Sequence, residues 1–173
     1  MDAATPAQRT RPLRHALALP ALCLIALAAV AWQQRPDGRL HLYWLATAGD
    51  AALIQTPAGR FVLIDGGGDP SQLTLQLGRR MPFWRRELLT ALLTGDDGRR
   101  LPGQVAALTR YRAALALAPP GLGEHGTAAE WRRLAGEPGT AARALRPGQR
   151  LALDGATLTV LAVEPGEEGG AVL

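Results

Sequence analysis

The sequence predicts a small α/β domain that follows one apolar helix near the N-terminus. Between residues 40 and 173, short runs of β-forming residues alternate with segments of helical spacing, which is typical of a layered α/β domain. One predicted strand ends in Asp65-Gly66-Gly67, and such a turn can present a carboxylate at an open sheet edge. The alternative is that Asp65 only caps the following turn. The length of 173 residues fits one domain and a targeting segment.

The N-terminal segment predicts a membrane anchor. Residues 16–34 carry no formal charge, and their apolar core approaches the length of a transmembrane helix. Because arginine beside a span tends to stay in the cytoplasm, residues 1–15 are expected to form a basic cytoplasmic N-terminus. The arginines that precede the span are Arg9, Arg11 and Arg14.

A cleaved signal peptide is the alternative for the same segment, since residues 29–31 read Ala-Val-Ala, as a cleavage site does. Either way, residues 35–173 are expected outside the cytoplasm, as a single-pass membrane protein or a secreted one. A short Pro/Gly linker over residues 35–39 then leads into the domain over residues 40–173.

The elements of the domain follow from periodicity and from turn residues. Two hairpins are expected, one around Pro57-Ala58-Gly59 and one around Asp154-Gly155-Ala156. One helix begins at a proline and ends in two arginines, as its dipole favours. The expected strands are 40–46, 51–55, 61–64, 88–93, 113–118, 151–153 and 157–163, and the expected helices are 70–80, 101–111 and 128–134.

Composition and motifs exclude several classes of site. Cys23 is the only cysteine, so a disulfide framework and a cysteine-based zinc site within one chain are excluded. Ser71 is the only serine and lies outside a Gly-x-Ser-x-Gly motif, and the glycines after Asp65 are not followed by the lysine of a P-loop. His41 and His125 each lack a second ligand at helical or strand spacing.

All 19 basic residues are arginine, and the net charge is +4. A GC-rich genome would produce this bias, and so would a surface that meets phosphate or anionic lipid. Six arginines could converge beside the predicted edge and contact a nucleic-acid backbone in a sequence-independent, salt-sensitive way. Solvated arginines on helix ends and loops are the alternative. The six are Arg79, Arg80, Arg85, Arg86, Arg99 and Arg100.

Three motifs in order resemble the start of a metallo-β-lactamase-type domain. They are Gly49-Asp50-Ala51-Ala52-Leu53-Ile54, Leu63-Ile64-Asp65-Gly66-Gly67, and Leu92-Leu93-Thr94 with the loop over residues 95–100. The apolar helix before them and the Pro82-Phe83-Trp84-Arg85-Arg86 segment after the first helix resemble the C-terminal domain of ComEC-family competence proteins, the membrane channels for DNA uptake. The resemblance implies a partial αββα sandwich, with one half and the start of the second.

The same resemblance implies a degenerate metal site. The family's loop reads Thr-His-x-His-x-Asp-His, and its side chains bind one or two metal ions. The equivalent positions here are Gly95, Asp97, Arg99 and Arg100, and two of them carry cations that would repel a divalent metal. We therefore expect no cofactor and no catalytic residue.

The function expected from the resemblance is a non-catalytic, membrane-anchored domain of, or descended from, a DNA-uptake apparatus. Its expected partners are the membrane and, by the same resemblance, DNA and a channel subunit or a chain that completes the fold. One alternative is an active hydrolase or nuclease that binds zinc or manganese through an unconventional set such as Asp65, Asp96 and Asp97, or through ligands from another subunit. The other is a structural interaction module that reuses the fold.

Overall fold

The computed structural model describes residues 11–33, 35–124, 126–163 and 171–173. The chain divides into two compact units, Met1–Arg35 and Pro36–Leu173. The predicted boundary between anchor and linker, after residue 34, lies one residue before this division and stays a prediction. The first ten residues of the predicted cytoplasmic N-terminus, and His125, lie outside the described residues.

The first unit contains one helix, α1 (Arg11–Gln33), which begins five residues before the predicted span. Over residues 20–32 its side chains are exposed, including those of Leu24, Ile25 and Trp32. The guanidinium carbon of Arg35 lies 3.9 Å from the centre of the Trp32 ring, as in a cation–π contact. No helix within the described residues combines the length and the apolar character needed to cross a membrane. The span over residues 16–34 stays a prediction.

The second unit is built on one six-stranded sheet in the order β1-β2-β3-β4-β5-β6. The first three strands form an antiparallel meander, and β3 to β6 run parallel to one another. Each parallel pair is joined through one helix, because parallel neighbours need a crossover connection. The bounds are β1 (His41–Trp44), β2 (Ala51–Gln55), β3 (Phe61–Asp65), α2 (Pro70–Arg80), β4 (Glu87–Leu92), α3 (Leu101–Arg110), β5 (Arg112–Ala118), α4 (Gly126–Ala135) and β6 (Ala141–Ala144).

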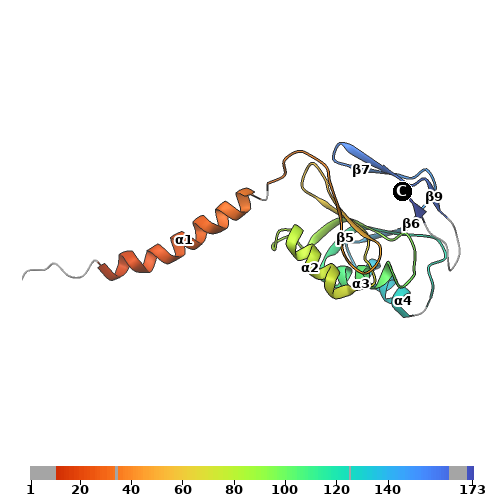
Figure 1. Ribbon diagram of the computed structural model, residues 1–173, viewed down its shortest axis with the longest axis horizontal. Helices are drawn as coiled ribbons and strands as arrows, with labels where there is room; N and C mark the ends of the chain where they lie inside the picture. Colours follow the sequence, from red (N-terminus) through yellow and green to blue (C-terminus); the bar gives the residue numbers. More distant parts are fainter. Residues whose placement is uncertain (1–10, 34, 125, 164–170) are drawn as a thin grey trace, which may run out of the picture. The chain divides into compact units, whose positions relative to one another are not determined.

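The three helices cover one face of this sheet (Figure 1). The main hydrophobic core lies between them and the sheet, with Leu53 and Leu63 from the strands against Leu73, Leu77 and Trp131 from the helices. Burial of such side chains contributes about 1.5–3 kcal/mol each. The predicted α/β layering is confirmed, because this core packs the helices against the sheet.

A second layer begins on the other face of the sheet. The hairpin of β7 (Arg150–Leu153) and β8 (Ala156–Thr159) packs Leu153 against Ile54 and Val62. Its turn is held by Asp154, which accepts hydrogen bonds from the Thr56 hydroxyl at 2.5 Å and from the guanidinium of Arg60. The predicted second hairpin is therefore confirmed, and it joins the first hairpin through these polar contacts.

Two details differ from the sequence-based expectation. The predicted strand over 157–163 is divided, because β8 ends at Thr159, although Val160 still donates its N–H to the carbonyl of Gln149 just before β7. A separate short pair then forms from β9 (Ala162–Val163) and β10 (Ala171–Val172). The edge strand β6 was not predicted, since its four residues are all exposed and lack an apolar pattern.

Candidate functional site

The carboxyl ends of β3, β4 and β5 lie at one edge of the sheet, because the three strands are parallel neighbours. Asp65 ends β3, and Thr94 follows β4 by two residues. Asp50 precedes β2, which runs antiparallel to β3, so it reaches the same edge. The loop over residues 95–100 therefore lies among residues from three separate segments.

Asp65 is the buried residue of this edge, with 4% of its surface exposed. The Thr94 backbone N–H donates to Asp65 Oδ1 at 2.6 Å, and the Thr94 hydroxyl donates to Oδ2 at 2.5 Å. Asp65 has a φ of 54°, a left-handed conformation that costs a residue with a side chain about 1 kcal/mol or more. The two hydrogen bonds hold this strained strand end against the next strand.

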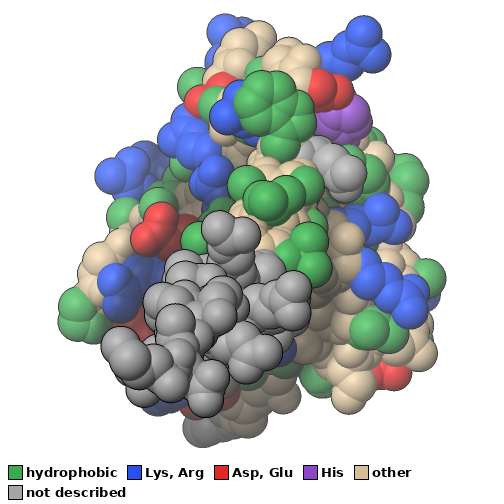
Figure 2. All heavy atoms as spheres, turned by 90° about the vertical axis from the view of Figure 1, so that its left-hand side faces the viewer, with side chains coloured by type: hydrophobic (Ala, Val, Ile, Leu, Met, Phe, Trp, Pro, Cys, Tyr) green, Lys and Arg blue, Asp and Glu red, His purple; other side chains and the backbone are tan. Residues whose placement is uncertain are grey.

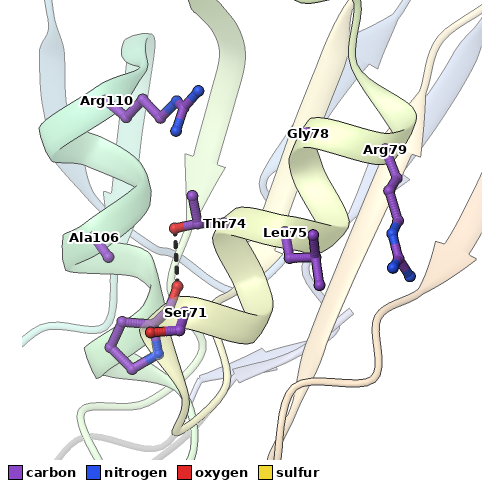
Figure 3. Close-up of a pocket in the computed structure, with 8 residues that line it drawn as sticks. Ser71, Thr74, Leu75, Gly78, Arg79, Ala106 and Arg110 are labelled. Carbon is purple, nitrogen blue, oxygen red and sulfur yellow. Dashed lines mark hydrogen bonds between the residues drawn. The ribbon is translucent and has the colours of Figure 1, made fainter.

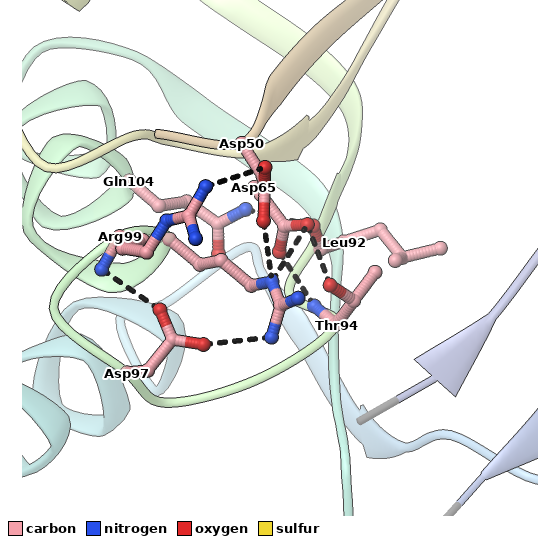
Figure 4. Close-up of polar contacts among 8 residues, drawn as sticks. Asp50, Asp65, Leu92, Thr94, Asp97, Arg99 and Gln104 are labelled. Carbon is pink, nitrogen blue, oxygen red and sulfur yellow. Dashed lines mark hydrogen bonds and ion pairs between the residues drawn. The ribbon is translucent and has the colours of Figure 1, made fainter. Parts of the chain in front are cut away.

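Arg100 joins three carboxylates at the same edge. Its Nη1 donates to Asp97 Oδ2 at 2.7 Å, its Nε donates to Asp50 Oδ2 at 3.2 Å, and Nε lies 4.0 Å from Asp65 Oδ2. Figure 4 shows Asp50, Asp65 and Asp97 approaching one another from three different segments. We call Arg100 with these three aspartates the Arg100 cluster. Its guanidinium supplies the positive charge that the three carboxylates require.

Arg99 takes a smaller part than its neighbour. Its guanidinium is 3.8 Å from Asp50 and its side chain is 75% exposed, against 31% for Arg100. Its main-chain carbonyl accepts the Asp50 N–H at 3.0 Å, and its own N–H donates to Asp97 Oδ1 at 2.8 Å. The backbone of Arg99 therefore fixes the position of the loop, while the side chain of Arg100 supplies a positive charge to the three carboxylates.

The glycines of the site are required by close packing. A Cβ atom on Gly66 would lie 1.9 Å from the backbone nitrogen of Gln104, and one on Gly103 would lie 1.8 Å from the carbonyl oxygen of Gly66. The first turn of α3 thus packs directly on the backbone that follows β3. This contact requires a glycine both in the turn after Asp65 and in the first turn of α3.

Sequence reasoning missed a buried polar pair behind the site. Gln104 is fully buried, donates to the Leu92 carbonyl at 2.8 Å and accepts the Trp131 indole N–H at 2.6 Å. The signal was present in the spacing, since Leu101, Gln104 and Leu108 fall on one face of the helix. This pair links β4, α3 and α4 beneath the loop.

Burial raises the pKa of Asp65 to about 6, although the hydrogen bonds from Thr94 and the charge of Arg100 act in the opposite direction. Folded Asp65 then holds its proton to higher pH than unfolded Asp65, whose usual value is 3.8. We expect the contribution of this group to the free energy of unfolding to fall, by at most about 3 kcal/mol, as pH rises from about 4 to about 6. Urea unfolding across this range measures it.

The matched variant for this pH dependence is Asp65→Asn, in which the titrating proton is absent. The difference in pH dependence between the wild type and this variant isolates the contribution of Asp65. Other carboxylates make the protein more stable as pH rises, such as Asp154, whose pKa Arg60 holds below its usual range. Parallel pH profiles for the wild type and Asp65→Asn would contradict the assignment.

The residues of the loop do not fit a divalent metal ion. Gly95 offers no side chain, Arg99 and Arg100 offer only cationic donors, and Asp97 is occupied by Arg100. Among the described residues, no group of three or more His, Cys, Asp or Glu side chains could hold a metal. In the same residues, every buried polar side-chain atom has a hydrogen-bond partner, so none is left directed at a missing ion.

The alternative metal-ligand set consists of Asp65, Asp96 and Asp97, and each of these carboxylates lies in a different environment. Asp65 accepts from Thr94, Asp96 accepts the Gly123 N–H at 3.1 Å, and Asp97 accepts from Arg100. Asp96 thus joins the loop after β4 to the loop after β5. Each carboxylate has a structural partner of its own.

The six arginines proposed for nucleic-acid contact fall into two groups. Arg99 and Arg100 lie at the carboxyl edge of β4, whereas Arg79, Arg80, Arg85 and Arg86 lie between the end of α2 and the start of β4, at the opposite edge. A strand of six residues separates the edges by about 20 Å. On the face drawn in Figure 2, arginine side chains are interspersed with hydrophobic ones over the visible surface. The structure does not bring the six together.

Comparison with solved structures identifies the architecture. Over 75% of its length the chain resembles MEM-A1, a subclass B3 metallo-β-lactamase from a soil metagenome library, with 20% identity and a TM-score of 0.52 over 52% of that protein. The Rm3 metallo-β-lactamase matches with 21% identity and a TM-score of 0.53, over 75% of this chain and 51% of its own.

A third neighbour is a HARLDQ-motif mutant of a metallo-β-lactamase from Cronobacter sakazakii, with 18% identity and a TM-score of 0.51, over 69% of this chain and 50% of that one. No protein-family model matches the chain, and no curated protein does either. The likenesses show a metallo-β-lactamase fold, and the chain spans about half the length of these structures.

Proposed function

We propose that this chain is a non-catalytic, membrane-anchored domain with a metallo-β-lactamase fold, similar to that of ComEC-type DNA-uptake proteins. The observation that carries the absence of catalysis is the Arg100 cluster. A guanidinium pairs with Asp97 and Asp50 where the fold's metal ligands belong, and it is 4.0 Å from Asp65. A second cation at this point would meet electrostatic repulsion and would have to displace an established salt bridge.

Anchoring is supported by the composition of α1. Within residues 20–32 its apolar side chains, such as Leu22, Leu24 and Ile25, are exposed. Exposed apolar surface of this extent marks contact with a membrane or a protein. The domain would then lie outside the cytoplasm as a single-pass protein, with the secreted form as the alternative.

A partner that completes the second layer is supported by β1. Leu42 and Trp44 pair with Ile54 and Ala52 and so share the face that the β7–β8 hairpin covers farther along the sheet. Yet Leu42 is 49% exposed and Trp44 is 77% exposed. We propose that a channel subunit or a further polypeptide covers this strip, and that DNA is handled by the assembly rather than by a groove of this domain.

The test is metal analysis of the purified full-length chain after exposure to Zn²⁺ and Mn²⁺ and removal of excess ion. We expect well below one metal per chain and no metal-dependent hydrolysis of a β-lactam or of DNA. The informative variant is Arg100→His, which removes the internal cation and adds an imidazole beside Asp97. If the wild type retained one metal per chain and lost it in Asp97→Asn, the proposal would be overturned.

An active metal-dependent hydrolase is the second candidate. One observation favours it: the neighbour from Cronobacter sakazakii is called a metallo-β-lactamase, and its motif, HARLDQ, includes an arginine that the mutant replaces by histidine. The same metal analysis decides between the candidates, because only the hydrolase requires a bound ion.

A further inference from the structure

A second surface of the domain carries exposed aromatic side chains among arginines. The segment from Arg79 to Arg86, here called the basic-aromatic loop, joins α2 to β4. Phe83 is 64% exposed and Trp84 is 46% exposed, and their rings meet edge to face with centroids 4.8 Å apart. Two neighbouring aromatic side chains on the outside of a folded domain are a marker of an interaction site.

The loop is held in place at both ends. The buried Met81 donates its N–H to the Leu77 carbonyl at 2.8 Å, and the Arg86 carbonyl accepts the Arg112 N–H at 2.8 Å. Between them, the Arg85 N–H donates to the Pro82 carbonyl at 2.9 Å and closes a turn. The two rings are therefore presented on an anchored backbone.

The charges around the two rings are mostly positive. None of the four guanidiniums of the loop lies within 4 Å of a carboxylate in the part of the chain that the structure describes. The guanidinium of Arg80 lies 4.7 Å from the centre of the Tyr43 ring. A neighbouring pocket adds two arginines and two carboxylates to the same edge, namely Arg110, Arg112, Glu87 and Glu137.

An open groove runs from this edge along the outside of the helices. It has a volume of about 690 Å³ and lies between α2 and α3, with Leu75, Gly78 and Ala106 in its wall. Arg79 and Arg110 are at its end nearest the basic-aromatic loop, on different helices (Figure 3). The edge thus combines guanidinium groups, aromatic rings and apolar surface.

We propose that the basic-aromatic loop is a contact site for an anionic lipid surface, with Phe83 and Trp84 at the headgroup level and the arginines on lipid phosphates. Tryptophan rings prefer the membrane interface, and nearby arginines are attracted to anionic lipid headgroups. A single nucleic-acid strand is the alternative occupant, because exposed rings and guanidinium groups also bind bases and phosphates, and the experiment below separates the two.

The inference rests on the membrane location proposed above. Seven residues, 34 to 40, separate the end of α1 at Gln33 from the start of β1 at His41. Such a segment spans at most about 25 Å, so a membrane-bound α1 would keep the domain at the bilayer surface. Surface contact through the basic-aromatic loop would then set which edge of the domain faces the lipid.

The experiment uses the full-length chain in vesicles with brominated lipids, either neutral phosphatidylcholine alone or with one third phosphatidylglycerol. Tryptophan fluorescence reports contact, because bromine quenches rings at the interface. We expect additional quenching in the anionic vesicles, lost in Trp84→Phe and retained in the control Trp44→Phe, which removes a more exposed ring elsewhere, 77% against 46%. Arg85→Gln with Arg86→Gln should also abolish it, whereas the control pair Arg143→Gln with Arg146→Gln should not.

Quenching that is equal in Trp84→Phe and wild type would overturn the inference. So would loss of affinity for a single-stranded oligonucleotide in the Arg85/Arg86 variant without any lipid-dependent quenching of Trp84, which would assign the loop to nucleic acid. Failure of the anchor is seen separately, as a wild-type chain that does not sediment with neutral vesicles. If the anchor fails in this way, binding to anionic vesicles that is tenfold weaker in the Arg85/Arg86 variant than in the wild type still supports lipid contact by the basic-aromatic loop. Binding equal to that of the wild type rejects it.

Discussion

Gly66→Ala is expected to lower the free energy of unfolding by about 3 kcal/mol. The added methyl group would lie 1.9 Å from the Gln104 backbone nitrogen and 2.5 Å from the Gly103 carbonyl carbon. These are backbone atoms, so the clash cannot be relieved by a rotamer change, and overpacking of this kind costs about 1–3 kcal/mol or more. Urea unfolding followed by circular dichroism measures the loss.

The control for this substitution is Gly78→Ala in α2. A Cβ atom on Gly78 would meet nothing within 4 Å, and the residue is inside an exposed stretch of helix. Since alanine is a better helix former than glycine by about 1 kcal/mol, this variant should be more stable than wild type. Equal effects of the two substitutions would show that α3 does not pack on the turn after β3.

Arg100→Met is expected to lower the free energy of unfolding at neutral pH by about 2 kcal/mol. The variant keeps much of the side chain's bulk but leaves three aspartates near one another without their cation, and hydrogen bonds to charged groups are worth about 1.5–3 kcal/mol. It should also raise the pKa of Asp65 further, because the charge of Arg100 lowers that pKa in the wild type. The loss should shrink toward pH 4, where Asp65 holds its proton.

Arg99→Met is the matched control at the adjacent position. Its guanidinium is 75% exposed and 3.8 Å from Asp50, and exposed ion pairs of this kind contribute about 0–1 kcal/mol. Unfolding of both variants in low and high salt separates the two roles. Equal losses would refute the view that Arg100 alone neutralises the loop.

The candidate site was predictable where it depended on local pattern. Asp65 ends a strand of β-forming residues and Thr94 follows the next predicted strand, so adjacency of parallel strand ends brings them together. The pairing of Arg100 with Asp50 was not predictable, because these residues are 50 positions apart and only the fold makes them neighbours. Gln104 was missed for a similar reason, since its partner Trp131 is in another helix.

The arginines show the same division. Their number and type follow from the chain alone, and so does the prediction that some meet anionic groups. Which of them act together depends on β4, whose length places Arg85 and Arg86 at one edge of the sheet and Arg99 and Arg100 at the other. The positions of these arginines along the sequence did not reveal that the two pairs lie at opposite edges of the sheet.

By itself the sequence determined the alternation of strands and helices, both hairpins and the lack of histidine at positions 95–100, because these depend on residue type and short-range spacing. Tertiary structure decided which charges meet. The antiparallel pairing of β2 with β3 and the parallel pairing of β3 with β4 bring Asp50, Asp65 and Asp97 around Arg100, since electrostatic pairing depends on distance through space rather than along the chain.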